Sequence, residues 1–580
     1  MRKNYLGKRI LATAMAATIM LGTAGCGSDK KSDTSYISGY SEGYTDSEND
    51  MEIKEENTIY DMSETAACES EVEESPQEDE FNTNEYDDLA ENSWLSVQSS
   101  PFSTFAADVD TASYSNIRSN IVNGYGVPAS SVRIEEMINY FHYDYETPEN
   151  GEKFAVHTEY ADCPWNEDTK LALISLNTEK IDFEDAPESN IVFLIDTSGS
   201  MFDANKLPLV QQSMCMLAEN LTEKDRVSIV TYAGDDTVVL EGASGDNYYK
   251  IASAIEQLEA GGSTNGAAGI ETAYALAEKY FIEGGNNRVI LATDGDLNVG
   301  VTSEGELEKL ITEKKKSGVF LSVIGVGYGN YKDNKLETLA DKGNGNYAYI
   351  DSIYEAKKAL VDDLGATMVT VAKDVKLQVE FNPEQVKGYR LIGYENRTMA
   401  AEDFADDTKD GGEMGAGHSV TAIYEIALVD SDMEINEPEL KYGQDSATAD
   451  DAEPQSEADV EKKSEYGDEL FTVNVRYKEP DGDKSELESY VYKEEDYSKN
   501  GSDNLRWAAA VAAFGMYMKN SEYMGTVNQK LIISLAESVA DYKEDEYKQE
   551  FVDLVNQYCD NEDSYTGYDD INTGYDDIIE

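Results

Sequence analysis

The sequence predicts an α/β fold in the middle of the chain, with a doubly wound, mainly parallel, Rossmann-like sheet and flanking α+β segments. Two observations predict this fold class. Short apolar runs alternate with helical patterns between residues 189 and 372, which is typical of parallel strands joined by helices. In addition, a turn rich in oxygen-bearing side chains, Asp196–Ser200, directly follows a buried-type strand, where ligands of such sheets bind.

The alternating region supplies the elements of this domain in order. Within residues 189–372, the expected strands are 191–195, 227–232, 289–292 and 319–326, and the expected helices are 206–221, 249–258, 267–281 and 306–316. The first helix is recognised by apolar residues that recur every three or four positions from Leu207 to Leu221.

Both flanks of this domain predict mixed structure. In residues 101–188 we expect helices at 113–123 and 132–143 and paired strands within 152–182. In residues 373–559 we expect strands at 375–381, 419–428 and 470–477, followed by helices at 504–519, 528–541 and 546–558. The apolar stretch 507–518 is too short to span a membrane and predicts a buried helix. Asp108 and Asp110 are expected at a capped helix start, with metal binding as the alternative.

The N-terminus has the pattern of a targeting segment. Basic residues within 2–9 precede an apolar stretch at 10–22, and Thr23-Ala24-Gly25-Cys26 follows. Small residues just before a cysteine resemble the lipobox of bacterial lipoproteins, with an ordinary secretory signal as the alternative. The resemblance implies removal of residues 1–25, lipid attachment at Cys26, and a lipid-anchored protein at the extracytoplasmic face of the cell membrane.

The charge of the chain is strongly acidic and narrows the classes of partner. There are 117 acidic and 46 basic residues, giving a formal net charge of −71, which argues against nucleic acid as a partner. Residues 26–100 predict a disordered acidic linker, residues 444–463 an acidic loop within the C-terminal region, and residues 560–580 an acidic tail. A self-repelling linker would hold the folded part away from the bilayer.

Three loops at the expected carboxyl edge of the sheet contain the candidate oxygen ligands for a metal ion. Asp196, Ser198 and Ser200 deliver a carboxylate and two hydroxyls within one turn, and hard cations such as Mg²⁺ prefer oxygen ligands of this kind. Thr264 lies in a glycine-rich loop that opens a helix, and Asp294 follows the strand at 289–292. Each of these two loops alone is an ordinary helix start or turn.

Taken together and in this order, the loops resemble the metal-ion-dependent adhesion site (MIDAS) of von Willebrand factor A (VWA) domains. The resemblance implies a divalent cation, Mg²⁺ first, with Mn²⁺ or Ca²⁺ as alternatives. It implies hydroxyl ligands from Ser198, Ser200 and Thr264, and carboxylates of Asp196 and Asp294 that hold the ion directly or through water. It also implies that a protein partner supplies an acidic residue to the remaining position.

The order of segments resembles a group of bacterial VWA lipoproteins over about residues 101–559. The resemblance predicts a membrane-anchored lipoprotein whose VWA domain binds a partner through the metal, in adhesion or protein–protein interaction. The alternative is a scaffold or accessory subunit of a cell-envelope complex. We do not expect an enzyme, because no nucleophile–base pair accompanies the metal motif.

Overall fold

The computed structural model describes residues 86, 89–107, 110–149, 151–181, 186–262, 266–295, 304–328, 332–363, 369–435, 466–480, 482, 484–493 and 497–572. The chain divides into two compact units, Met1–Gln77 and Glu78–Glu580, and every described residue belongs to the second. The predicted signal segment, Cys26, the acidic loop 444–463 and Thr264 lie outside the described residues.

The central domain contains a six-stranded sheet in the order β10-β9-β8-β5-β6-β7. Its strands are β5 (Ser189–Asp196), β6 (Arg226–Tyr232), β7 (Asp236–Ser244), β8 (Asn286–Thr293), β9 (Phe320–Val326) and β10 (Tyr347–Ile350). All neighbours are parallel except the edge strand β7, which is antiparallel to β6. Every residue of β5 is buried, as expected for a strand covered on both faces. The predicted doubly wound, mainly parallel sheet is therefore confirmed.

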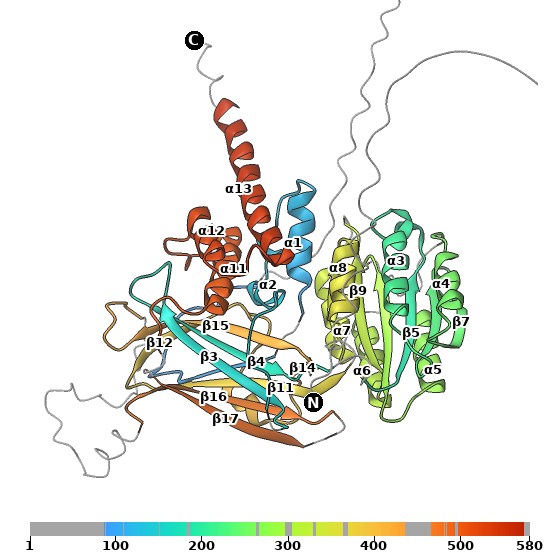
Figure 1. Cartoon of the computed structure of the whole chain (residues 1–580), viewed down its shortest axis with the longest axis horizontal. Helices are drawn as coiled ribbons and strands as arrows, with labels where there is room; N and C mark the ends of the chain where they lie inside the picture. The colour runs from blue at the N-terminus through green and yellow to red at the C-terminus, as the bar shows by residue number, and fades with distance from the viewer. Residues whose placement is uncertain are drawn as a thin grey trace, which may run out of the picture. The chain divides into compact units, whose positions relative to one another are not determined.

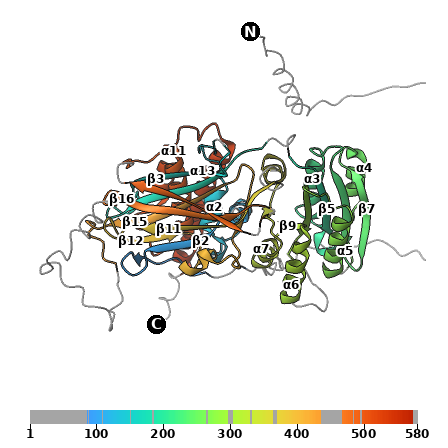
Figure 2. The ribbon, with the colours of Figure 1, turned by 90° about the horizontal axis from the view of Figure 1, so that it is seen from below.

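Helices cover the two faces of this sheet in two layers (Figure 1; Figure 2). One layer contains α3 (Leu207–Ala218), α4 (Tyr248–Glu256), α8 (Ile353–Lys357) and a π-helical turn, η5 (Lys358–Asp362), and the other contains α5 (Gly266–Lys279), α6 (Glu304–Lys314) and α7 (Asp333–Lys342). Neighbouring residues of β5 serve opposite layers, since Phe193 packs in the first core and Leu194 in the second.

Two antiparallel sheets outside the central domain are built from both flanks of the chain. One has the order β1-β12-β15-β4-β3, and the other has the order β13-β2-β11-β16-β17, with β14 paired to β11. Their strands are β1 (Leu95–Ser96), β2 (Phe102–Ala106), β3 (Phe154–Asp162), β4 (Lys170–Thr178), β11 (Thr370–Phe381), β12 (Val386–Ile392), β13 (Thr398–Met399), β14 (Gly412–Gly415), β15 (Ser419–Leu428), β16 (Glu469–Lys478) and β17 (Ser485–Lys493). Because β4 pairs with β15 and β2 with β11, the central domain is an insertion between β4 and β11.

Helices from both flanks also share one apolar core. They are α1 (Ala112–Val122), α2 (Ile134–Asn139), α11 (Asp503–Lys519), α12 (Gln529–Glu537) and α13 (Glu546–Asn572). Helix α11 is buried almost throughout from Trp507 to Met518, which confirms the predicted buried helix. Among the helices of the described ranges, none has the length and apolarity needed to cross a bilayer.

Several boundaries and roles differ from those predicted. Strand β1 lies inside the predicted linker 26–100 and pairs with β12, and α13 continues to Asn572, inside the predicted tail 560–580. Asp110 does not cap a helix, and it belongs to no metal-type cluster of the residues that the structure describes. Its carboxylate accepts a hydrogen bond from the backbone N–H of Tyr347 (2.9 Å) and pairs with Arg397 (3.2 Å), while Thr111 occupies the cap position of α1. The other candidate, Asp108, is outside the described residues.

Candidate metal centre

The carboxylate of Asp196 stands at the end of the central strand β5 and is fully buried. The backbone N–H of Ser198 donates to its Oδ1 atom (2.8 Å), and the hydroxyl of Thr293 donates to its Oδ2 atom (3.2 Å). Thr293 is the last residue of β8, which pairs with β5. Two neighbouring strand ends therefore hold this carboxylate in a fixed orientation.

The two serine hydroxyls of the same turn lie close together, with Ser198 Oγ 3.0 Å from Ser200 Oγ. In an octahedron with metal–oxygen bonds of about 2.0–2.1 Å, adjacent ligand oxygens are about 2.8–3.0 Å apart. The pair therefore fits two adjacent positions around one Mg²⁺ ion. Ser198 is buried, whereas Ser200 is exposed, so the hydroxyl pair reaches from the interior to the surface.

The glycine-rich loop that precedes α5 is tied to this turn by its backbone. The N–H of Gly261 donates to the carbonyl of Thr197 (2.8 Å), and the N–H of Gly199 donates to the carbonyl of Gly262 (3.2 Å). Thr264 follows two residues later, outside the described residues. The loop that carries the predicted third hydroxyl is thus fixed beside the serine pair as far as Gly262.

Asp294 is buried directly after β8, and its Oδ2 atom accepts a hydrogen bond from Lys206 Nζ at 3.1 Å. The Lys206 side chain is itself only 9% exposed. Gly327, at φ +81°, makes room for it, because a Cβ at this position would lie 2.5 Å from Lys206 Cε. Lys206 was not predicted as part of the site, since nothing in the sequence around a lysine just before a helix indicates such a partner.

Burial dominates the electrostatics of this centre. Burial, with a smaller contribution from the nearby charge of Asp294, raises the pKa of Asp196 to about 6, against the hydrogen bonds from Ser198. Within the described ranges, no group of three His, Cys, Asp or Glu side chains is placed to hold a metal. The donor set at β5 is instead carboxylate plus hydroxyl, which suits a hard cation such as Mg²⁺.

Comparisons with known proteins agree with this architecture. Residues 190–363 match the family model described as von Willebrand factor type A domain, residues 366–560 match "Uncharacterized protein YfbK, C-terminal", and residues 80–173 match a model described as "von Willebrand factor". The Escherichia coli K12 protein described as "Uncharacterized protein YfbK" is 39% identical over 480 residues, covering 82% of this chain and 80% of the relative. This chain belongs to the YfbK family. Its central domain is a VWA domain, as the motif order predicted, and VWA domains typically mediate protein–protein interactions.

Other similar proteins cover less of the chain or lie at lower similarity. The Synechocystis protein described as "Uncharacterized protein sll0103" is 32% identical over 171 residues, which is 29% of this YfbK-family chain and 39% of the relative. Among solved structures, "von Willebrand factor type A from Catenulispora acidiphila" is 16% identical, covers 68% of this chain and 89% of its own, and has a TM-score of 0.38.

Proposed function

We propose that this YfbK-family chain is a metal-dependent protein-binding module. A divalent cation, Mg²⁺ first, would be held by Asp196, Ser198, Ser200, Thr264 and Asp294, and when bound it would supply an electrophilic centre for a carboxylate of a protein partner. The observation that carries this proposal is the 3.0 Å separation of the two serine hydroxyls beside two buried carboxylates. We infer docking rather than catalysis because no nucleophile–base pair accompanies this oxygen donor set in the sequence.

The formal charge of the centre supports a metal-dependent switch in what it attracts. Ionised Asp196 and Asp294 with protonated Lys206 sum to −1, which repels a carboxylate. A divalent ion changes this sum to +1, which attracts one. The other acidic residues of the chain weaken this attraction only where they lie within about 8 Å of the partner carboxylate, which is the Debye length at physiological salt.

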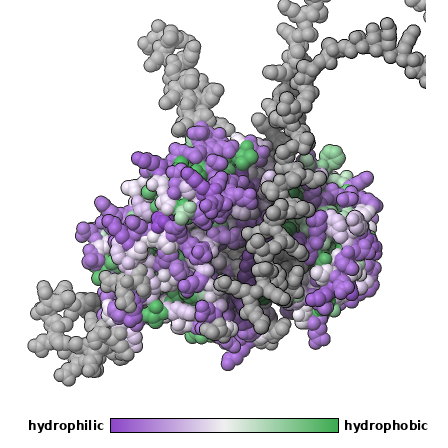
Figure 3. All heavy atoms as spheres, viewed as in Figure 1, coloured by the Kyte–Doolittle hydropathy of each residue, from purple (hydrophilic) through white to green (hydrophobic). Residues whose placement is uncertain are grey.

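The polar character of one face of the molecule is consistent with recognition by charge. On the face of the molecule shown in Figure 3, hydrophilic residues predominate and apolar ones are scattered. Scattered apolar residues are normal on a monomer and do not mark a docking patch. Phe202, two residues after Ser200, is 79% exposed, so the proposal assigns specificity to the ion and to the exposed side chains around it, Phe202 included.

We further propose that the protein is held at the extracytoplasmic face of the cell membrane by lipid on Cys26, with the acidic linker as a spacer. The basis is the lipobox-like sequence alone. Replacement of Cys26 with Ser should move the protein from the membrane fraction to the soluble fraction. Unchanged membrane association of this variant would contradict the anchor without touching the metal proposal.

The metal proposal is tested on the purified protein and then on envelope extracts. Isothermal titration with MgCl₂ should show one site in the wild type and none in Asp196→Ala or in Ser200→Ala, which changes only an exposed hydroxyl. Asp246→Ala, an exposed aspartate of the same domain, is the matched control and should bind as the wild type. Equal Mg²⁺ binding by Asp196→Ala and the wild type would refute the site.

Capture from envelope extracts then separates the two functions. A protein retained in Mg²⁺, released by EDTA and lost with Asp196→Ala would support adhesion to an external ligand. A membrane complex with the same metal dependence would support the scaffold alternative. Capture that is unchanged by EDTA and by the Asp196→Ala substitution would contradict a docking role for the ion.

A further inference from the structure

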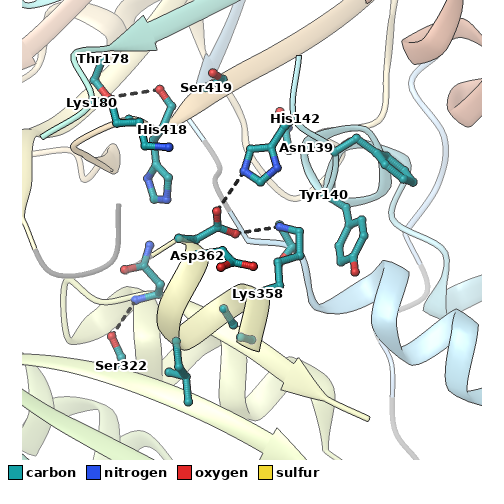
Figure 4. Close-up of a pocket in the computed structure, with 18 of the residues that line it drawn as sticks. Asn139, Tyr140, His142, Thr178, Lys180, Ser322, Lys358, Asp362, His418 and Ser419 are labelled. Carbon is teal, nitrogen blue, oxygen red and sulfur yellow. Dashed lines mark hydrogen bonds and ion pairs between the residues drawn. The ribbon is translucent and has the colours of Figure 1, made fainter. Parts of the chain in front are cut away.

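A cavity of about 460 Å³, drawn in Figure 4, lies where β8, β9 and β10 begin. Asp196 stands at the other end of the sheet, where the parallel strands finish. The cavity wall includes the beginnings of β8, β9 and β10, the π-helical turn η5, the segment after α2 and the start of β15. Arg288, near the start of β8, is six residues from Asp294, which corresponds to about 20 Å along a strand. The volume is in the range of small-molecule sites, and the cavity is separate from the metal centre.

One end of the cavity is apolar. Ile290 of β8 and Ile324 of β9 face it, together with Leu217 of α3 and Leu360 of η5, and all four belong to the same apolar core. Arg288 and Ser322 come two residues earlier on the same two strands, so they share this face of the sheet. The cavity therefore has an apolar floor that continues into a polar end.

The polar end contains a buried cation, Arg288, that forms no ion pair with a carboxylate of the residues that the structure describes. Arg288 is 2% exposed, donates one hydrogen bond to Ser322 Oγ (2.5 Å), and its Nε–H has no hydrogen-bond partner. Among the described residues, Glu413 is the acid that acts on it electrostatically, and burial raises the pKa of Glu413 well above its ordinary value. Glu413 forms no ion pair or hydrogen bond with Arg288, and both Arg288 Nε and Glu413 Oε1 are buried without a hydrogen-bond partner among the described residues. A buried guanidinium without a paired carboxylate is costly in the interior.

A second hydrogen-bond donor faces the same space. The Nδ1 atom of His418 accepts a hydrogen bond from the backbone N–H of Gly415 (3.2 Å), so its ring proton is on Nε2. Burial lowers the pKa of His418 to about 4, which keeps the ring neutral at physiological pH. Figure 4 shows the imidazole of His418 pointing into the cavity.

The two aspartates of the cavity wall, Asp362 and Asp363, already have cationic partners. Asp363 contacts both Lys358 Nζ (2.8 Å) and His142 Nε2 (3.0 Å), and Asp362 pairs with Lys357 (2.7 Å). The exposed lining residues Lys180 and Glu146 carry opposite charges, so they add no net charge to the cavity. Within the described part of the chain, Arg288 is thus a buried cation of the polar end without an ion-pair partner.

We propose that this cavity binds a small organic anion with one carboxylate or phosphate head and an apolar tail. The head lies against Arg288 and the Nε2–H of His418, and the tail lies on the floor formed by Leu217, Ile290, Ile324 and Leu360. A guanidinium matches the two oxygens of a carboxylate or phosphate with parallel hydrogen bonds. The proposal goes beyond partner docking and requires no metal at Asp196.

The test is isothermal titration of the full chain in EDTA, so that its outcome is independent of the metal centre. The probes are decanoate, decyl phosphate, decanol and inorganic phosphate. We expect one site for decanoate or decyl phosphate, whichever head fits, and at least tenfold weaker binding of decanol and of inorganic phosphate. Equal binding of decanol and decanoate, or no binding of either anion at millimolar concentration, would overturn the proposal.

A matched pair of variants tests the assigned head group. Arg288→Met should weaken binding of the anion at least tenfold while the melting temperature stays equal or rises, because an unbalanced buried cation is removed. Arg226→Met is the control, since that guanidinium donates only to the carbonyls of Glu223 and Asp225, outside the cavity. Unchanged anion affinity in folded Arg288→Met would refute the role of Arg288. If that variant fails to fold, the four-probe comparison on the wild type still decides the proposal.

Discussion

Replacement of Lys206 with Met removes the ammonium from Asp294 and should tighten Mg²⁺ binding. In the metal-free protein, Lys206 Nζ stabilises the buried carboxylate from 3.1 Å. At an effective dielectric constant of about 20, this attraction is about 5 kcal/mol. A bound divalent ion would neutralise Asp294 without the lysine, so the substitution raises the free energy of the metal-free state more than that of the loaded state.

The size of the effect follows from the burial of the pair. Removal of one partner from a buried ion pair costs about 3–5 kcal/mol. This cost sets the upper limit on the gain in Mg²⁺ binding free energy, which corresponds to about 150–5000-fold. Because the methionine leaves some of the desolvation cost of Asp294 in place, we expect a gain of at least about tenfold, together with a melting temperature in EDTA that is lower by several degrees.

Titration calorimetry with MgCl₂ and thermal unfolding in EDTA and in Mg²⁺ measure both quantities. Lys279→Met is the control, because Lys279 is an exposed lysine of the same domain and pairs with Glu241 at the surface. In Lys206→Met, saturating Mg²⁺ should restore most of the lost melting temperature. Mg²⁺ affinity equal to or weaker than that of the wild type, in a folded variant, would refute the idea that lysine and metal compete for Asp294.

Three further perturbations test other features of the structure. Gly327→Ala should displace Lys206 and shift Mg²⁺ affinity in the same direction as Lys206→Met. Gly284→Ala is the control, because Gly284 has a similar φ of +72° but no heavy atom within 4 Å of the added Cβ. It should cost only about 1–2 kcal/mol in unfolding free energy. Arg118→Ala leaves the buried carboxylates of Asp351 and Glu355 without their guanidinium, so it should lower the free energy of unfolding in urea by about 3–5 kcal/mol. Arg506→Ala removes the half-exposed pair with Asp503 and should lower it by about 1 kcal/mol or less. The pKa of His418 is about 4 in the folded state and about 6.5 when unfolded, so the unfolded chain binds the proton first on acidification and stability falls between pH 6.5 and 4. From pH 7 to pH 5 the wild type should lose about 2 kcal/mol more than His418→Gln, and parallel losses would contradict the assignment.

The strands that are buried on both faces were predictable from the sequence, because such strands are nearly continuous apolar runs. Strand β5 is apolar along almost its whole length, and β8 and β9 repeat the pattern, so their positions follow from residue types alone. Strand β7 was not predicted, because it is an edge strand with mostly exposed side chains, among them Val238 and Val239. Its pairing depends on β6 rather than on its own pattern.

The candidate site was predictable where its residues share one turn or directly follow a recognisable strand, as Asp294 follows β8. Asp196, Ser198 and Ser200 are neighbours in sequence, and their closeness follows from the turn itself. Lys206 and Asp294 are 88 residues apart, and Arg288 and Ser322 are 34 residues apart, so only the pairing of strands brings each couple together. No local pattern distinguishes such a lysine or arginine from an exposed one.

The insertion of the VWA domain between β4 and β11 has a consequence for the order in which the chain is made. In the β4–β15 pair, Leu171 faces Glu425, which is synthesised 254 residues later (425 − 171). At about 5–20 residues per second, strand β4 waits about 13–50 s for its neighbour. All strands of the VWA sheet emerge within that interval, so this domain can fold while the edge of β4 is still open. During the same interval, β15 of a second nascent chain could pair with that edge, which makes domain-swapped dimers the characteristic misassembly to look for during production of this protein.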